Sequence, residues 1–243
     1  MSELKRRRRK RIKKSGKRLL RRTGDFFKQQ SLIGPGPVFE KTVFPWIAEF
    51  EDHWKVIKSE LDAVLIQRDQ LPTFHEVSPD QKHISKGDDW KIFPLYVFGD
   101  PVESNCARCP ETAQLLSRVP RIENAMFSIL SPNYQIPPHR GPTNGIVRVH
   151  LGLIVPEEKE SCQIRVDDQI FGWEEGKCVV FDDFYEHEVW NNTDQQRVVL
   201  FFDVDRPMKL AGRLLNRLFI NAIKRTGYGK DPVKNIQKLD EAA

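Results

Sequence analysis

Three histidines and two arginines in the second half of the chain could together bind a metal ion and an anion. His139 stands in residues 138–142 (PHRGP) and His187 in the sequence EHE, each beside an apolar stretch. Arg148 and His150 lie between them in the apolar stretch VRVHLGL, and Arg197 begins the stretch RVVLFF. Neutral imidazole nitrogens are suitable ligands for iron(II), among other divalent metals.

The arginines indicate a bound anion. Arg148 and His150 are two positions apart, so in a strand they share one side while the neighbouring valines and leucine face the other. A charged side chain in such a place needs a partner of opposite charge, because burying a charge alone is costly. A guanidinium group suits a carboxylate, which it contacts with two N–H groups. A dicarboxylic acid such as 2-oxoglutarate would satisfy Arg148, Arg197 and the histidine together.

The pattern lacks one expected metal ligand. Non-haem iron sites usually add an aspartate or glutamate to two histidines. That carboxylate would stand two positions after His139, where this chain has Gly141. The residues alone therefore leave two interpretations open: a metal site, or a set of hydrogen-bonded polar residues near strand ends.

The elements that position these residues are expected to be short strands. Apolar stretches separated by turn residues predict strands at 91–98, 126–130, 146–155, 161–166, 169–173, 178–181 and 198–204. Many short antiparallel strands at this spacing predict a mainly β fold, a sandwich or jelly roll. Apolar residues at three- and four-residue steps predict flanking helices at 45–66, 110–118 and 209–225.

Charge and composition divide the chain into four parts. We expect a basic tail (1–30), a helical or irregular region (31–90), a β core (91–208), and an amphipathic helix with a tail (209–243). Residues 1–22 carry a net charge of +12 and the whole chain +5, which leaves −7 for the remainder. The first interpretation is a solvated, disordered tail. The second is a basic helix with a narrow apolar stripe, which contacts an anionic membrane surface. Nucleic acid is the less favoured partner, because no recognition motif accompanies the basic run.

The location follows from what the sequence contains. No apolar run approaches the roughly 18–20 residues of a membrane-spanning helix. No apolar segment follows the basic stretch, so the N-terminus does not read as a secretory signal. We therefore expect a cytoplasmic protein, with peripheral membrane contact through its basic ends as the alternative.

The chain resembles the aspartyl/asparaginyl β-hydroxylase family of iron(II)/2-oxoglutarate dioxygenases. The similarity covers about residues 88–208, and it is carried by SILSP (128–132), PHRGPTN (138–144), RVHLGL (148–153), WEEGK (173–177), VFDDFYEHEVW (180–190), Arg197 and DV (203–204). The resemblance implies a double-stranded β-helix (jelly-roll) core. It also implies iron(II), 2-oxoglutarate and O₂ as cofactor and cosubstrates.

The family's functional residues map onto this chain by position. His139 and His187 match the iron ligands and so the catalytic centre. The positions that hold 2-oxoglutarate match Ser128, Arg148, His150 and Arg197, and Trp90 matches an aromatic residue of the same pocket. Gly141 agrees with the peptide-hydroxylating branch, which also has glycine there.

Other segments resemble the related lipid A acyl-chain hydroxylases. These are Cys109-Pro110-x-Thr112 and Asp203-Val204-x-Arg206-Pro207, although that branch usually has aspartate at the position of Gly141. The resemblance implies hydroxylation of an unactivated C–H bond in a peptide or amino-acid substrate. The alternatives are hydroxylation of a lipid acyl chain at the cytoplasmic membrane face, and a catalytically silent jelly roll that binds another carboxylate.

Overall fold

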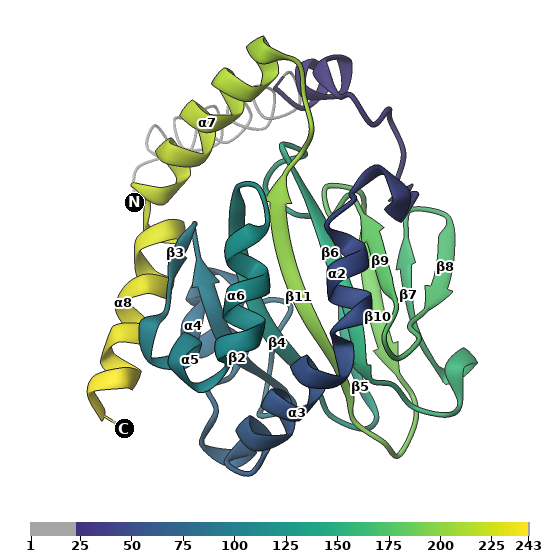
Figure 1. Cartoon of the computed structure of the whole chain (residues 1–243), viewed down its shortest axis with the longest axis vertical. Helices are drawn as coiled ribbons and strands as arrows, with labels where there is room; N and C mark the ends of the chain where they lie inside the picture. Colours follow the sequence, from purple (N-terminus) through teal and green to yellow (C-terminus); the bar gives the residue numbers. More distant parts are fainter. Residues whose placement is uncertain (1–22, 243) are drawn as a thin grey trace, which may run out of the picture.

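Two antiparallel sheets form the core of the protein (Figure 1). The computed structural model describes residues 23–242, except the side chains of residues 227–228 and 239–242. The larger sheet has the order β1 (Val38–Phe39), β9 (Cys178–Phe181), β6 (Ile146–Ile154), β11 (Arg197–Asp205), β4 (Ile122–Leu130), β2 (Trp90–Val97) and β3 (Asp100–Pro101). The smaller sheet has the order β5 (Tyr134–His139), β10 (His187–Asn191), β7 (Cys162–Val166) and β8 (Gln169–Gly172). The predicted jelly-roll core with flanking helices is confirmed.

Alternation along the central strands sorts side chains to the two faces of the larger sheet. On β11, Val198, Leu200 and Phe202 belong to one buried apolar cluster, whereas Val199 and Phe201 belong to the other. The first face is the outer face, and helices α2 (Ile47–Asp52), α3 (Trp54–Leu65) and α6 (Pro110–Arg118) cover it. The second, inner face carries the predicted site residues.

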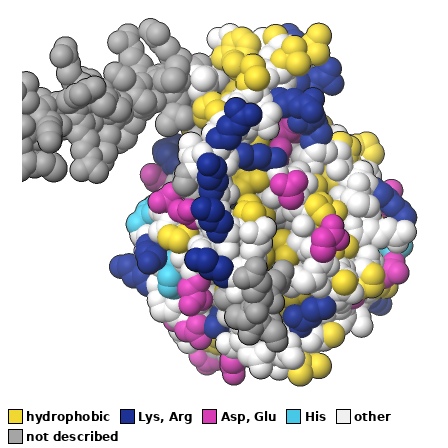
Figure 2. Space-filling view, turned by 90° about the vertical axis from the view of Figure 1, so that its left-hand side faces the viewer, with side chains coloured by type: hydrophobic (Ala, Val, Ile, Leu, Met, Phe, Trp, Pro, Cys, Tyr) yellow, Lys and Arg dark blue, Asp and Glu magenta, His cyan; other side chains and the backbone are white. Residues whose placement is uncertain are grey.

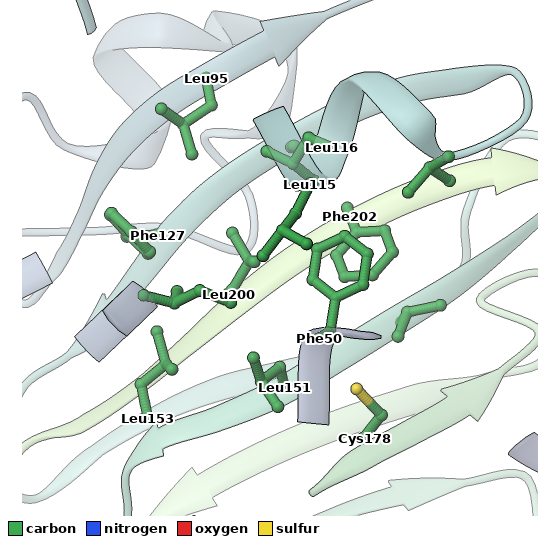
Figure 3. Packing of buried hydrophobic residues seen from close by; sticks show 14 of the residues in the cluster. Phe50, Leu95, Leu115, Leu116, Phe127, Leu151, Leu153, Cys178, Leu200 and Phe202 are labelled. Carbon is green, nitrogen blue, oxygen red and sulfur yellow. The ribbon is translucent and has the colours of Figure 1, made fainter. Parts of the chain in front are cut away.

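The outer face packs as a continuous apolar core. Figure 3 shows Phe50 of α2 and Leu115 and Leu116 of α6 against Phe127, Leu151, Leu200 and Phe202 of the sheet. The Phe50 and Phe202 rings stack with centroids 4.9 Å apart. This core holds the strands rigid on the side opposite the site.

The inner face is covered by two different layers. The smaller sheet covers one half. Helices α4 (Phe74–Val77), α7 (Leu210–Lys224) and α8 (Gly227–Ala242) lie on the side of β2 and β4. The remaining helical segments are residues 23–30, α5 (Glu103–Arg108), and the single turns η1 (Lys41–Val43), η2 (Arg68–Gln70), η3 (Pro79–Gln81) and η4 (Lys159–Ser161). No helix within residues 23–242 is long and apolar enough to cross a membrane.

Several sequence expectations change in detail. The expected helix 45–66 is interrupted at His53. The tail expected after residue 225 is instead α8, which packs Val233 and Ile236 into the inner apolar cluster. The neighbouring strands expected at 169–173 and 178–181 lie in different sheets, β8 in the smaller and β9 in the larger. The helix expected in the basic tail is present at residues 23–30, and its earlier part lies outside the described residues.

One buried arginine joins four separate segments. The Arg206 guanidinium is completely buried and forms an ion pair with Asp182, directly after β9. It also donates to the carbonyl oxygens of Asn144 at 2.8 Å and Gly34 at 3.3 Å, and to Ser31 Oγ at 3.3 Å. The segment before β1 is therefore attached to the end of β9 and to the chain that leads into α7.

Candidate active site

The two histidines predicted as metal ligands meet across neighbouring strands of the smaller sheet. His139 of β5 and His187 of β10 are directly opposite partners, and their ring centroids lie 4.1 Å apart. The register shifts between His187 and Val189. Such irregularities redirect side chains.

Both rings carry a proton on the same nitrogen. Nδ1 of His139 lies 2.8 Å from the carbonyl oxygen of Pro137, and Nδ1 of His187 lies 2.9 Å from that of Tyr185. Because a carbonyl oxygen only accepts, each Nδ1 donates and each Nε2 keeps its lone pair. Burial lowers the pKa of His139 to about 4 and that of His187 to about 3. Two neighbouring neutral rings whose Nε2 atoms keep their lone pairs fit a divalent ion such as iron(II).

The described residues offer two protein ligands there and not three. Within residues 23–242, no group of three or more His, Cys, Asp or Glu side chains is placed to hold a metal. A Cβ atom built on Gly141 would overlap the carboxyl group of Asp183. Asp183 is 1% exposed, and its Oδ2 lies 3.0 Å from Nη2 of Arg148. The space at position 141 is therefore filled by an aspartate from another loop.

Replacing Gly141 with alanine is expected to destabilise the protein by about 2 kcal/mol or more, because the added methyl group must displace the buried Asp183. Urea unfolding measures the change. Gly172→Ala is the matched control, since the nearest neighbours of its added Cβ would lie at 3.5 Å, an ordinary contact distance. Equal stability of the two variants would refute the steric explanation.

Arg197 is a buried cation without an anion. It is 1% exposed, and its Nε and Nη1 have no hydrogen-bond partner in the described part of the chain. Its guanidinium lies over the ring of Trp173, 4.6 Å from the centroid. Burial lowers the pKa of Arg197 to about 10, so the group is still charged at neutral pH. A bound carboxylate would supply the missing partner.

His150, which is neutral, offers a hydrogen-bond donor close to Arg197. Trp173 donates its Nε1–H to Nδ1 of His150 at 3.3 Å. The proton of the neutral ring must then sit on Nε2, which is buried and has no partner among the described residues. Burial, with a smaller effect of Arg197, lowers the pKa of His150 well below its usual value. His150 and Arg197 both contact Trp173, and each has N–H groups without a partner among the described residues.

Aromatic contacts connect this pair to the metal ligands. The ring of Phe181 lies 5.9 Å from that of His187 and 5.0 Å from that of His150. The structure thus brings His139, His187, His150 and Arg197 into one chain of contacts through Phe181 and Trp173. Their roles as metal ligands and as a carboxylate site stay predictions.

Arg148 is placed differently from Arg197. Its Nε and Nη2 bond both oxygens of Asp203 at 2.9 and 3.1 Å, in addition to the contact with Asp183. The anionic partner that the sequence demanded for Arg148 is thus present within the protein. Contact between Arg148 and a cosubstrate stays a prediction.

A cavity opens beside His139 and extends between the larger sheet and helices α4, α7 and α8. Four predicted site residues line it: His139, Trp90, Ser128 and Arg148. Trp90 donates to Ser128 Oγ at 3.0 Å and stacks on Phe74, with centroids 4.1 Å apart. His150, His187 and Arg197 are buried and lie outside this lining. Much of the wall beyond His139 is apolar, with Phe74, Val77, Ile84, Met126, Ile220 and Ile223.

Three acidic residues line the cavity, and of these Asp183 and Asp203 pair with Arg148 whereas Glu123 does not. Glu123 is 8% exposed, and its Oε2 has no hydrogen-bond partner within residues 23–242, although Lys224 Nζ lies 3.8 Å away. Burial raises the pKa of Glu123 from 4.5 to about 7. The carboxyl group is therefore partly protonated at neutral pH, which suits an apolar cavity.

Because the pKa of Glu123 is raised in the folded protein, the free energy of unfolding should depend on pH. Between about pH 4.5 and 7 the folded chain holds a proton that the unfolded chain has lost, so stability falls as pH rises. We expect Glu123→Gln to match the wild type near pH 4.5 and to be more stable at pH 8. Urea unfolding at both values measures this, with the exposed Glu157→Gln as control. A wild-type pH slope in Glu123→Gln would contradict the prediction.

The sequence did not identify three residues that build the site: Trp173, Asp183 and Asp203. Asp203 follows Arg197 by an even number of positions in one strand, so their shared face was a usable signal. Trp173 and Asp183 come from separate connections, and no spacing links them to the arginines.

Several known proteins are similar to this chain. The sequence profile described as aspartyl/asparaginyl beta-hydroxylase matches residues 51–207. An ornithine lipid ester-linked acyl 2-hydroxylase from Rhizobium tropici is 45% identical over 209 residues, which cover 86% of this chain and 74% of that protein. The human aspartyl/asparaginyl beta-hydroxylase is 36% identical over 166 residues, 66% of this chain but 21% of that protein. A prolyl-4-hydroxylase structure from Pseudomonas putida aligns with a TM-score of 0.39 and 18% identity, over 64% of this chain and 88% of that one.

Proposed function

The chain belongs to the aspartyl/asparaginyl β-hydroxylase family, and on that premise we propose that it is an iron(II)- and 2-oxoglutarate-dependent dioxygenase that hydroxylates an unactivated C–H bond. The observation that carries the proposal is Arg197, a buried cation that has no anion among the described residues and contacts Trp173 together with His150. Phe181 contacts both His150 and the neutral His187, which lies beside His139. A catalytically silent domain that binds a carboxylate would need Arg197 and His150, but it would not need the two neutral histidines.

Each residue has a distinct task in this mechanism. His139 and His187 would hold the iron, with their Nδ1–H bonds to backbone carbonyls fixing the ring orientation. Arg197 would bind the cosubstrate carboxylate that lies away from the metal, and His150 Nε2–H would donate to the same molecule. Trp173 lies against both residues and keeps water from them. When bound, iron(II) and 2-oxoglutarate supply oxygen activation with release of succinate and carbon dioxide.

The cavity wall supports one substrate class. Apolar side chains from α4, α7 and the sheet line the space beyond His139. Of the three acidic residues in the wall, Asp183 and Asp203 pair with Arg148, and burial raises the pKa of Glu123. We propose a lipid acyl chain as substrate, in line with the 45% identical relative. An aspartyl or asparaginyl residue, the substrate class in the name of the human relative, is the competing outcome.

Succinate release and product mass test both levels of the proposal. The protein with iron(II) and 2-oxoglutarate is supplied with a membrane lipid extract, an aspartyl peptide or no substrate. We expect succinate only with lipid, together with a gain of one oxygen atom on an acyl chain. Succinate with the peptide alone would reject the acyl substrate and keep the dioxygenase. Absence of iron-dependent succinate with every substrate would reject the dioxygenase itself.

A further inference from the structure

Helix α7 exposes a row of leucines to solvent. Leu210, Leu214 and Leu218 are 62%, 56% and 67% exposed and follow one another at four-residue steps, so they share one side of the helix. Nine large hydrophobic residues are exposed among those described, and four of them, including Leu215, lie on this helix. Such a contiguous apolar strip indicates an interaction surface rather than scattered exposure.

The opposite side of α7 is fixed to the body. Phe219 meets Phe27 edge-on at 6.3 Å, and Asn216 donates to the carbonyl oxygen of Gly145 at 2.8 Å. Ile220 and Ile223 line the cavity beside His139. Since this side is already packed, the leucine row cannot turn inward without breaking these contacts. It is a permanent feature of the surface.

Cations border the leucine row. Arg213 and Arg217 are exposed, lie one turn apart between the leucine side and the packed side, and form no ion pair with any described residue. Figure 2 shows hydrophobic side chains gathered at the top of the molecule next to a run of Lys and Arg side chains. The helical segment 23–30, which packs on α7 through Phe27, directly follows residues 1–22 with their net charge of +12. The positive charge favours an anionic partner, and the exposed leucines favour an apolar one.

We propose that α7 seats the protein on an anionic phospholipid bilayer, with Leu210, Leu214 and Leu218 in the acyl layer and Arg213 and Arg217 at the phosphates. Nucleic acid would satisfy the arginines and leave the leucines exposed. A bilayer satisfies both. The inference rests on the proposed lipid substrate in one respect: because Ile220 and Ile223 of the same helix line the cavity, docking places that cavity next to the membrane from which an acyl chain would enter.

Vesicle flotation of the full chain tests the surface without iron or 2-oxoglutarate. We expect the protein to float with vesicles containing phosphatidylglycerol. Leu210→Gln, Leu214→Gln and Leu218→Gln together should lower the partition coefficient on the order of tenfold or more. The matched control changes three exposed residues elsewhere, Val56→Gln, Ile66→Gln and Ile170→Gln, which should keep binding within about twofold of wild type. Circular dichroism melting checks that both triple variants remain folded.

A second pair of variants tests the charge. Arg213→Gln with Arg217→Gln should weaken binding to phosphatidylglycerol vesicles several-fold and leave binding to phosphatidylcholine vesicles unchanged. Equal loss in the leucine and control variants, or no loss in either, would overturn the proposal. So would sedimentation showing that the leucine variant turns a dimer into a monomer, because a second copy would then be the partner.

A failure of the membrane-docking proposal can be distinguished from a failure of the proposed function. A variant with His139→Ala and His187→Ala should float like the wild type while releasing no succinate. Lipid-dependent succinate release by a protein that does not float would reject the docking surface and leave the dioxygenase proposal intact.

Discussion

Replacing Arg197 with methionine is expected to stabilise the ligand-free protein and to abolish its response to 2-oxoglutarate. The guanidinium is 1% exposed and has no anion beside it, so an apolar side chain of similar volume removes a desolvation cost on the order of 1–4 kcal/mol. In the wild type, 2-oxoglutarate that binds only the folded state raises the melting temperature, and this shift should disappear in the variant. kcat/KM for 2-oxoglutarate should fall about a hundredfold or more.

Arg206→Met is the matched control, because Arg206 is equally buried but pairs with Asp182. Its removal leaves a buried carboxylate alone and should destabilise the protein by about 3–5 kcal/mol. Opposite signs for two buried arginines, measured by thermal unfolding without ligand, would identify Arg197 as the one that waits for an anion. If Arg197→Met destabilises the protein as strongly as Arg206→Met, the interpretation of Arg197 as a cosubstrate site is wrong.

Replacing His187 with alanine is expected to abolish iron(II) binding and turnover while the protein stays folded. Loss of an outer-shell partner alone costs about 10- to 100-fold in metal affinity or activity, so loss of one of two protein ligands should exceed that range. Calorimetric titration with iron(II) under anaerobic conditions measures the affinity, and succinate release measures turnover.

His53→Ala controls for the loss of a histidine as such. Nδ1 of His53 also contacts a backbone carbonyl, that of Glu49 at 2.8 Å, but the residue is exposed and lies at the end of α2. It should bind iron and release succinate like the wild type. Wild-type turnover in His187→Ala would remove the basis for a two-histidine centre.

Most strands of the larger sheet could be predicted, because each has a recognisable pattern of apolar residues in the sequence. Residues 146–154 and 197–205 are apolar with polar residues confined to one side, and the structure has strands at these positions. The two strands that carry His139 and His187, the predicted metal ligands, were not predicted. β5 contains Pro137 and Pro138 and has few buried residues, and β10 is short and begins between two glutamates. Their strand character comes from pairing with each other, which no local pattern reveals.

The sequence identified residues that the structure brings together, but it did not show which of their charges are paired. The sequence placed Arg148 and Arg197 in equivalent roles, as buried cations in need of an anion. In the structure Asp203 and Asp183 neutralise Arg148, whereas Arg197 contacts the ring of Trp173 and pairs with no acidic residue of the described part of the chain. Which arginine has a protein partner depends on strand order and on a loop that reaches Gly141. The spacing of residues along the sequence gives neither the strand order nor the path of that loop.

The contacts of Arg206 set a limit on how far the chain can be shortened. The family match begins at residue 51, yet Arg206 bonds to Ser31 and Gly34, and β1 pairs with β9 just before Asp182. A truncated protein that starts at residue 51 would lose the edge strand and expose a charged pair now sealed from water. A working minimal enzyme should therefore begin before Ser31.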